Sequence, residues 1–499
     1  MTRLSSACAA LALMLTASFA VAGCDALDSE VYGDLTPETF FNSEADFQNA
    51  IAALYNPFIS DWGTFDAGAD TWYASLYNAD PKTYWNQSIT TTDEIFSPWS
   101  STMDCFEWGA AGLDYDQAPT YAKIRYVARA TDVIDKIQES EAPVSDAVKA
   151  SYVAEARAVR GWLMYVLFDF YGPVNVKLDP ETLSDNEITP RLSQEEYVAA
   201  MEADLTEAIP SLADRYNGDA ANWGRMSKGT ARMVLLRLYM HEKRWAEAEA
   251  VARDLMGMGY GLLPSYVDVF NQEQNNEMIH AIPANQSSPN YWTQQVIPGN
   301  YGTGRTASGA EVTRGPGWYG FWMPWDFYDT YEEGDLRLGT ILAEYTDARG
   351  VVRSRDTSPA LQGAIPLKYT AIQGDGPAYD FDTPVFRYAE VLLSLAEAVN
   401  EQGRTGEAFQ YANEVRQRAG VDTWSGMSQG QLRDALLAER GRELYAEGVR
   451  RQDLIRHGRY IEVAQRLECS QAQPYHVLFP IPYSVVLQSE GVVEQNPGY

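Results

Sequence analysis

Residues 385–420 read VFRYAEVLLSLAEAVNEQGRTGEAFQYANEVRQRAG, and this stretch decides the fold. It predicts two helices joined by a tight glycine turn. The first helix carries apolar residues on two faces, so we predict that other elements pack against both faces. The second has one Ala-rich stripe, and Gly420 stands where a C-terminal cap belongs. Because such a hairpin cannot bury its faces alone, it indicates a tetratricopeptide-like solenoid of stacked copies.

Further helices with the same character occur on both sides of this hairpin. Helical periodicity predicts them over residues 120–140, 145–171, 193–212, 227–240, 245–258, 428–447 and 449–465. The period fails in two long segments, about 60–119 and 259–384, which are rich in Gly, Asn, Pro and aromatic residues. The sequence therefore predicts a mostly α fold, a tetratricopeptide-like helical solenoid with two large irregular insertions and a few short strands.

The N-terminus has the pattern of a lipoprotein signal. An apolar run over residues 7–22 follows Arg3 and ends in the lipobox VAGC at 21–24. We expect residues 1–23 to be a signal peptide, removed before Cys24, whose sulfur is lipidated. The mature chain, residues 24–499, then forms a single domain anchored to a membrane by lipid.

The charge balance argues against nucleic acid as a partner. The chain has 69 acidic and 38 basic residues, a net charge of -31, which repels phosphate backbones. A neutral ligand fits this balance better.

No catalytic or metal motif is evident, so we expect neither an enzyme nor a cofactor. The four histidines are scattered, and no zinc pair, nucleophile elbow or phosphate loop occurs. A glycosidase carboxylate pair would meet only in space and stays open. So does Ca²⁺ at residues 374–382, where Asp375, Asp380 and Asp382 are hard donors without EF-hand spacing. The charged residues from 439 to 459 are expected to form ion pairs on a helix surface.

Loop aromatics are the informative class of residue. An indole or phenol ring can stack on the C–H face of a pyranose, while neighbouring polar side chains bond its hydroxyls. The alternative is that these rings pack the insertions onto the solenoid. The candidate ligand-binding residues in the two insertions are Trp99, Trp108, Trp292, Tyr301, Trp318, Tyr319 and Trp322.

A series of motifs in order along the chain resembles the SusD/RagB family of outer-membrane nutrient-uptake lipoproteins. The motifs are EARAVR at 155–160 with YGPV at 171–174, KGTA at 228–231, DFYDTYEEGDLR at 326–337, KY at 368–369, RYAE at 387–390, AEA at 396–398, ER at 439–440, DLIR at 453–456, PIP at 480–482 and QNPGY at 495–499. The segment TDE at 92–94 resembles the family's loop that bears binding aromatics. The resemblance therefore adds Asp93 to the candidates and supports Trp99.

The resemblance implies a non-catalytic lipoprotein on the cell surface of an outer membrane. It would capture oligosaccharides and deliver them to a SusC-like TonB-dependent transporter. Peptide cargo is an alternative within the family. A glycoside hydrolase and a periplasm-facing adaptor that binds proteins in the solenoid groove are alternatives outside it.

Overall fold

A computed structural model of the chain describes residues 40–59, 75–80, 82–100, 106, 108, 119–185, 187–285, 287–313, 315–369, 382–467 and 469–499. The predicted signal peptide, Cys24, Asp375 and Asp380 lie outside these residues. Within the described ranges, no helix combines the length and apolar character needed to cross a membrane.

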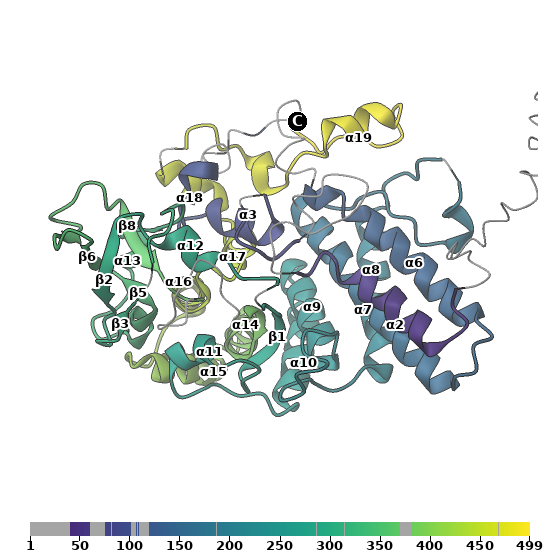
Figure 1. Cartoon of the computed structure of the whole chain (residues 1–499), viewed down its shortest axis with the longest axis horizontal. Helices are drawn as coiled ribbons and strands as arrows, with labels where there is room; N and C mark the ends of the chain where they lie inside the picture. The colour runs from purple at the N-terminus through teal and green to yellow at the C-terminus, as the bar shows by residue number, and fades with distance from the viewer. Residues whose placement is uncertain are drawn as a thin grey trace, which may run out of the picture.

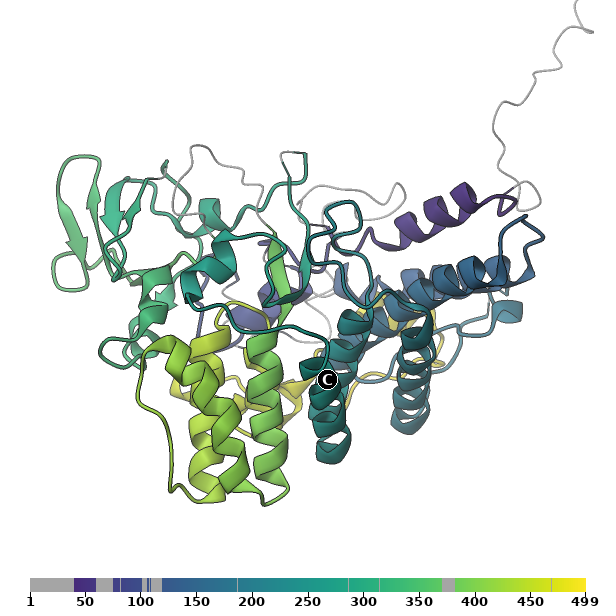
Figure 2. The ribbon, with the colours of Figure 1, turned by 90° about the horizontal axis from the view of Figure 1, so that it is seen from below.

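A row of antiparallel helices forms the scaffold (Figures 1 and 2). In chain order the helices are α2 (Glu44–Leu54), α6 (Ile124–Glu139), α7 (Asp146–Tyr171), α8 (Gln194–Ala208), α9 (Lys228–His241), α10 (Trp245–Met256), α14 (Tyr388–Glu401), α15 (Thr405–Ala419) and α16 (Gln429–Leu444). Consecutive helices pack from α6 to α10, and α10 then packs on α14 across the large insertion between them. The solenoid is thus continuous in space although it is interrupted in sequence, and the predicted fold class is confirmed.

Helix ends follow local signals. Ser145 begins α7 by accepting a hydrogen bond from the Val148 amide, and Ser193 and Ser428 form capping boxes at α8 and α16. Gly420 ends α15 with a left-handed φ of 74°. The single helix predicted over 449–465 is instead two, α17 (Arg450–Arg456) and α18 (Tyr460–Arg466).

The second insertion starts and ends on one pair of strands. β1 (Met278–Ile282) is antiparallel to β9 (Thr383–Arg387), which leads directly into α14. The short helix α11 (Tyr266–Asn271) precedes β1. Between β1 and β9 lie α12 (Trp292–Val296), α13 (Trp325–Tyr328) and two small sheets of order β3-β2-β6-β7 and β4-β8-β5. The strands are β2 (Tyr301–Arg305), β3 (Glu311–Val312), β4 (Met323–Pro324), β5 (Ile341–Leu342), β6 (Glu344–Asp347), β7 (Val352–Ser354) and β8 (Gly363–Pro366).

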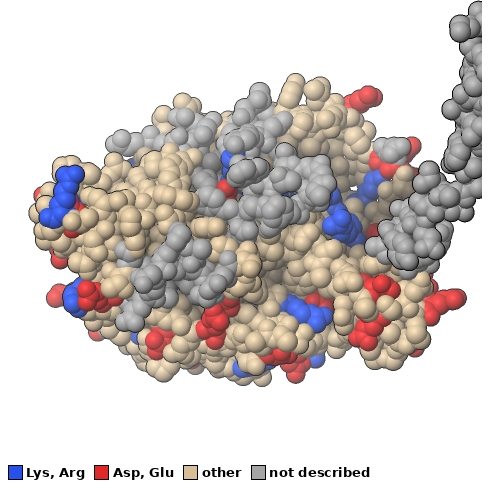
Figure 3. Space-filling view, in the orientation of Figure 1, with Lys and Arg blue, Asp and Glu red and all other residues tan. Residues whose placement is uncertain are grey.

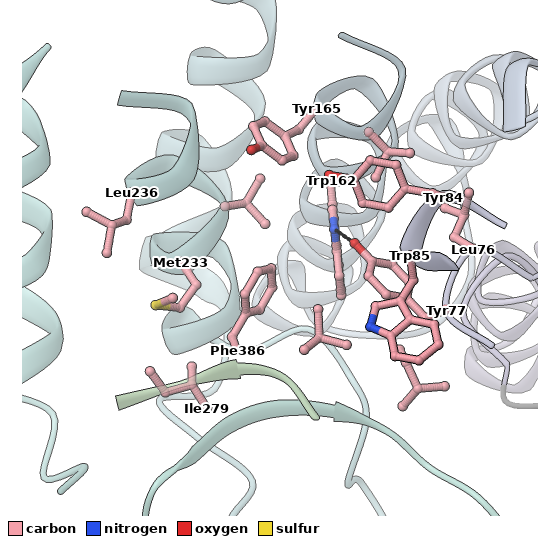
Figure 4. Close-up of a cluster of buried hydrophobic side chains, with 14 of the residues drawn as sticks. Leu76, Tyr77, Tyr84, Trp85, Trp162, Tyr165, Met233, Leu236, Ile279 and Phe386 are labelled. Atoms are coloured by element: carbon pink, nitrogen blue, oxygen red, sulfur yellow. Dashed lines mark hydrogen bonds between the residues drawn. The ribbon is translucent and has the colours of Figure 1, made fainter. Parts of the chain in front are cut away.

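The first insertion contains a buried helix that periodicity does not reveal. α3 (Tyr84–Thr90) has all seven residues buried, so its polar and apolar faces cannot be distinguished in the sequence. Residues just before it enter the core of the solenoid, where the indole N–H of Trp162 in α7 donates to the Tyr77 hydroxyl at 2.9 Å (Figure 4).

Ion pairs predicted for residues 439–459 do form, such as Glu439 with Arg442 at 2.7 Å. Their predicted place on the helix surface is wrong for residues 439–447, because the fold buries these side chains. Arg387 has no exposed surface and pairs with Glu277 at 2.9 Å, Glu443 at 2.5 Å and Glu447 at 2.8 Å. Lys368 also binds Glu447, at 2.7 Å. This buried ion network joins α16 to β1, β9 and the segment after β8. Its charges are removed from water, so each carboxylate depends on its cation.

Charged side chains are unevenly spread over the face seen in Figure 3. They lie mainly toward its lower edge and ends, while uncharged residues make up most of the described surface between.

Candidate functional site

Two tryptophans from the two insertions lie exposed side by side. Trp99, in the short 3-10 turn Pro98–Ser100, and Trp318, in the loop before β4, are each 47% exposed. Their ring centroids are 6.1 Å apart and their planes are inclined by 58°. We call this pair the tryptophan platform. Two large exposed apolar side chains in contact with each other form a candidate binding surface.

Backbone pairing holds the two halves of the platform together. The Phe96 amide donates to the Trp322 carbonyl at 2.9 Å, and the Trp322 amide donates back at 3.1 Å. The Trp99 ring lies directly against Gly320, where an added Cβ would be 2.2 Å from the ring. Glycine at 320 therefore permits the position of Trp99.

The Trp318 loop is fixed to the helix α12 beneath it. The Trp318 amide donates to the Gln294 carbonyl at 2.7 Å, and the Gly320 amide donates to the Gln295 carbonyl at 2.6 Å. Below the loop, Phe321 stacks on Trp292 with centroids 5.8 Å apart and planes 12° apart. The platform thus rests on a packed aromatic core and is preorganised.

Trp292 belongs to that core, so its prediction as a ligand contact is corrected. It has no exposed surface, and its indole N–H donates to the Pro366 carbonyl at 2.8 Å. Its loop-like sequence context concealed this, because Trp85 and Tyr369 cover it from distant parts of the chain.

Tyr301 and Trp108 are likewise buried, so their prediction as ligand contacts is also corrected. Tyr301 lies in β2 and donates from its hydroxyl to the Val312 carbonyl at 2.8 Å. Trp108 donates to the Tyr499 hydroxyl at 2.9 Å and packs against His476 and Phe479 near the C-terminus. Neither belongs to the tryptophan platform.

Tyr319 and Trp322 form a ridge beside the platform. Their rings stack with centroids 5.1 Å apart, and Trp322 is largely buried while Tyr319 is half-buried. The Tyr319 hydroxyl donates to the Gly363 carbonyl at 3.1 Å, and burial raises its pKa. Phe96, 36% exposed, packs on Trp322 at 4.9 Å. Sequence reasoning missed Phe96, although its position three residues before Trp99 was a usable signal.

Asp93 is held by arginines within the protein. Arg450 donates to both carboxylate oxygens, at 2.8 and 2.9 Å, and Arg466 lies 3.5 Å away. Burial opposes ionisation of Asp93, but the two arginines outweigh it and its pKa is lowered. The carboxylate therefore anchors the loop that carries Phe96 and Trp99 to helix α17.

The acidic segment considered for Ca²⁺ is described only at Asp382. One oxygen of Asp382 accepts from the Trp223 indole at 2.5 Å and the other from the Ala284 amide at 3.1 Å. Its carboxylate is thus already used within the protein.

Comparisons with known proteins bear on this site. Residues 338–499 match the family described as the SusD family. The SusD-like protein P25 of Formosa agariphila is 25% identical over 93% of this chain and 94% of its own length. The starch-binding protein SusD of Bacteroides thetaiotaomicron is 25% identical over 87% of each chain. The solved surface glycan-binding protein A of Bacteroides thetaiotaomicron, in complex with laminarihexaose, is 21% identical, covers 91% of this chain and 99% of its own, and superposes with a TM-score of 0.71.

Proposed function

Because the chain belongs to the SusD family, we propose that it is a non-catalytic protein that binds oligosaccharides at the tryptophan platform. The exposed, backbone-fixed pair of Trp99 and Trp318 carries this proposal. Two inclined indoles provide apolar surface for successive sugar rings without requiring charge on the ligand. Starch binding in the name of one relative and laminarihexaose in the solved complex of a neighbour support a glycan as ligand.

Isothermal titration calorimetry against neutral and acidic oligosaccharides, including laminarihexaose and maltohexaose, tests the ligand class. Replacing either Trp99 or Trp318 with alanine should weaken binding about tenfold, since burying part of an indole is worth roughly 1–2 kcal/mol. Tyr483→Ala is the matched control, because this 48% exposed ring lies in α19 (Tyr483–Gln488), outside the platform. Equal effects of all three substitutions would reject the platform as the site.

Two outcomes distinguish the alternatives. Binding of peptides in place of glycans, lost in the same two variants, would transfer the site to peptide cargo. Release of reducing ends from a bound oligosaccharide would establish a glycoside hydrolase.

We further propose that lipidated Cys24 anchors the protein to the outer face of an outer membrane beside a SusC-like TonB-dependent transporter. The lipobox at 21–24 supports the anchor, and membership of the family supports the partner. Protease treatment of intact cells should cut the wild-type protein, whereas a periplasm-facing adaptor would be spared. Cys24→Ala should release the protein from membranes, and affinity purification should recover the transporter from solubilised membranes.

A further inference from the structure

A pocket of about 260 Å³ lies beside the tryptophan platform. Its walls come from three separate parts of the chain: α3 and the loop that follows it, the segment around β4 and β8, and the end of α18. Its lining includes Phe96 and Trp322, the residues whose backbones join the two insertions, and Leu467. We call this the side pocket.

The side pocket has few hydrogen-bond donors to offer. The Thr90 hydroxyl donates to the Asn86 carbonyl at 3.0 Å, and the Thr92 hydroxyl donates to the Ile89 carbonyl at 2.7 Å. Both hydroxyl protons are thus used within the protein, and the rings of Phe96 and Trp322 supply apolar surface to the lining. At the rim, the exposed Gln362 amide makes no side-chain hydrogen bond to another described residue. It is the available polar group among the described side chains of the lining.

The side pocket has too few available hydrogen-bonding side chains to bind an unmodified sugar ring. A buried hydroxyl without a partner costs about 1–3 kcal/mol, and an ordinary pyranose carries several hydroxyls. An apolar group has no such requirement and gains by leaving water. The volume is also below the roughly 300–1,000 Å³ of pockets that enclose a whole ligand, so only part of a ligand fits.

The geometry couples the side pocket to the platform. Phe96 precedes Trp99 by three residues, and Trp322 follows Trp318 by four, so the same two loops carry both surfaces. The Phe96 ring is 36% exposed and packs on Trp322 at the pocket wall. A glycan stacked on the platform can therefore direct a substituent across Phe96 into the side pocket.

We propose that the side pocket binds an apolar substituent of the oligosaccharide, such as the methyl group of a 6-deoxy sugar, an O-methyl group or an O-acetyl group. This proposal rests on the proposed glycan-binding function and adds a preference for decorated over plain glycans. Phe96, Trp322 and Leu467 enclose the substituent, and the Gln362 amide bonds the oxygen next to it.

Matched monosaccharide pairs test the side pocket without knowledge of the natural glycan. The probes are L-fucose against L-galactose, and methyl 6-O-acetyl-α-D-glucopyranoside against methyl α-D-glucopyranoside. Binding is measured by saturation-transfer NMR titration at millimolar concentration. The methyl-bearing member of at least one pair should bind about fourfold tighter, which is the effect of removing one methyl-sized group from water. Equal affinity within both pairs, or no binding by any member, overturns the proposal.

Two variants locate the effect. Leu467→Gln keeps the side-chain size at a 36% exposed position and should abolish the preference for the methyl-bearing member, whereas Trp318→Ala should retain it. Leu467→Ala, which enlarges the pocket, replaces the glutamine variant if circular dichroism shows that the latter is unfolded. Retention of the preference in the Leu467 variant contradicts the assignment. If the wild-type protein binds no oligosaccharide in calorimetry but still prefers the methyl-bearing monosaccharides, the proposed function is rejected and the assignment of the side pocket stands.

Discussion

Glu94 should make the stability of the protein depend on pH, because its carboxyl group is buried beneath the platform loop. The side chain has no exposed surface, and no side chain among the described residues hydrogen-bonds to either oxygen. Burial raises its pKa well above the ordinary value. Arg450, Lys368 and the backbone of Ala446 oppose the rise, and Asp93 adds to it. The folded protein therefore keeps Glu94 protonated at pH values where the unfolded chain has released the proton.

The sign and the magnitude follow from proton linkage. Between the unfolded pKa, about 4.3, and the raised folded pKa, the folded state binds more protons, so stability falls as pH rises. The loss is about 1.4 kcal/mol per pH unit in that window. Glu94→Gln has nearly the same shape and no proton to lose. The free energy of unfolding of Glu94→Gln should therefore rise relative to that of the wild type by about 1.4 kcal/mol for each pH unit within this window.

Urea unfolding at pH 5.0, 6.0 and 7.0, followed by tryptophan fluorescence, measures this difference. Glu333→Gln, at an exposed glutamate, is the control and should follow the wild type at all three values. A difference between Glu94→Gln and wild type that stays constant from pH 5.0 to 7.0 would show that Glu94 is ionised in the folded protein, and would refute the reasoning.

Three further substitutions test the supports of the site. Arg387→Met leaves three buried glutamates without their shared cation. It should lower the free energy of unfolding by about 3–5 kcal/mol at pH 7 and by less at pH 5, measured by urea titration. The control Arg355→Met, at an exposed ion pair, should lower it by less than about 1 kcal/mol in the same titration. Gly320→Ala should displace the Trp99 ring and weaken glycan binding about tenfold, measured by calorimetry. The control Gly406→Ala places its Cβ in open space and should leave the affinity unchanged. Unchanged affinity in Gly320→Ala would contradict the close contact between Gly320 and Trp99. Asp93→Asn should lower stability by about 1–3 kcal/mol in urea but change glycan affinity less than twofold, whereas a larger loss of affinity would make Asp93 a ligand contact after all.

The helical scaffold could be predicted from the sequence because its signals are local. Apolar residues that recur every three or four positions, serine caps and Gly420 act within a few residues of one another. Helix α3 lacks these signals, since all of its faces are buried, and its existence depends on neighbours contributed by the rest of the chain.

The candidate binding surface could be identified only in the tertiary structure. Trp99, Trp292 and Trp318 all stand in glycine-rich or polar loop sequence, yet Trp292 is fully buried and the other two are exposed. The difference arises from Trp85 and Tyr369, which are distant in sequence and cover only Trp292. The sequence could therefore indicate the kind of residue to consider as a ligand contact, whereas the exposure of each side chain in the fold identifies Trp99 and Trp318 as the candidates.

The sequence by itself determined the helical hairpins, the likeness to the SusD family and the aromatic character of the insertions. Only the tertiary structure decided that Trp99 and Trp318 form one platform and that Glu443 and Glu447 lie in a buried ion network. The physical reason is the range of the interactions. Helix formation depends on hydrogen bonds four residues apart, whereas burial of a ring or a charge depends on whichever distant segments the completed fold brings against it.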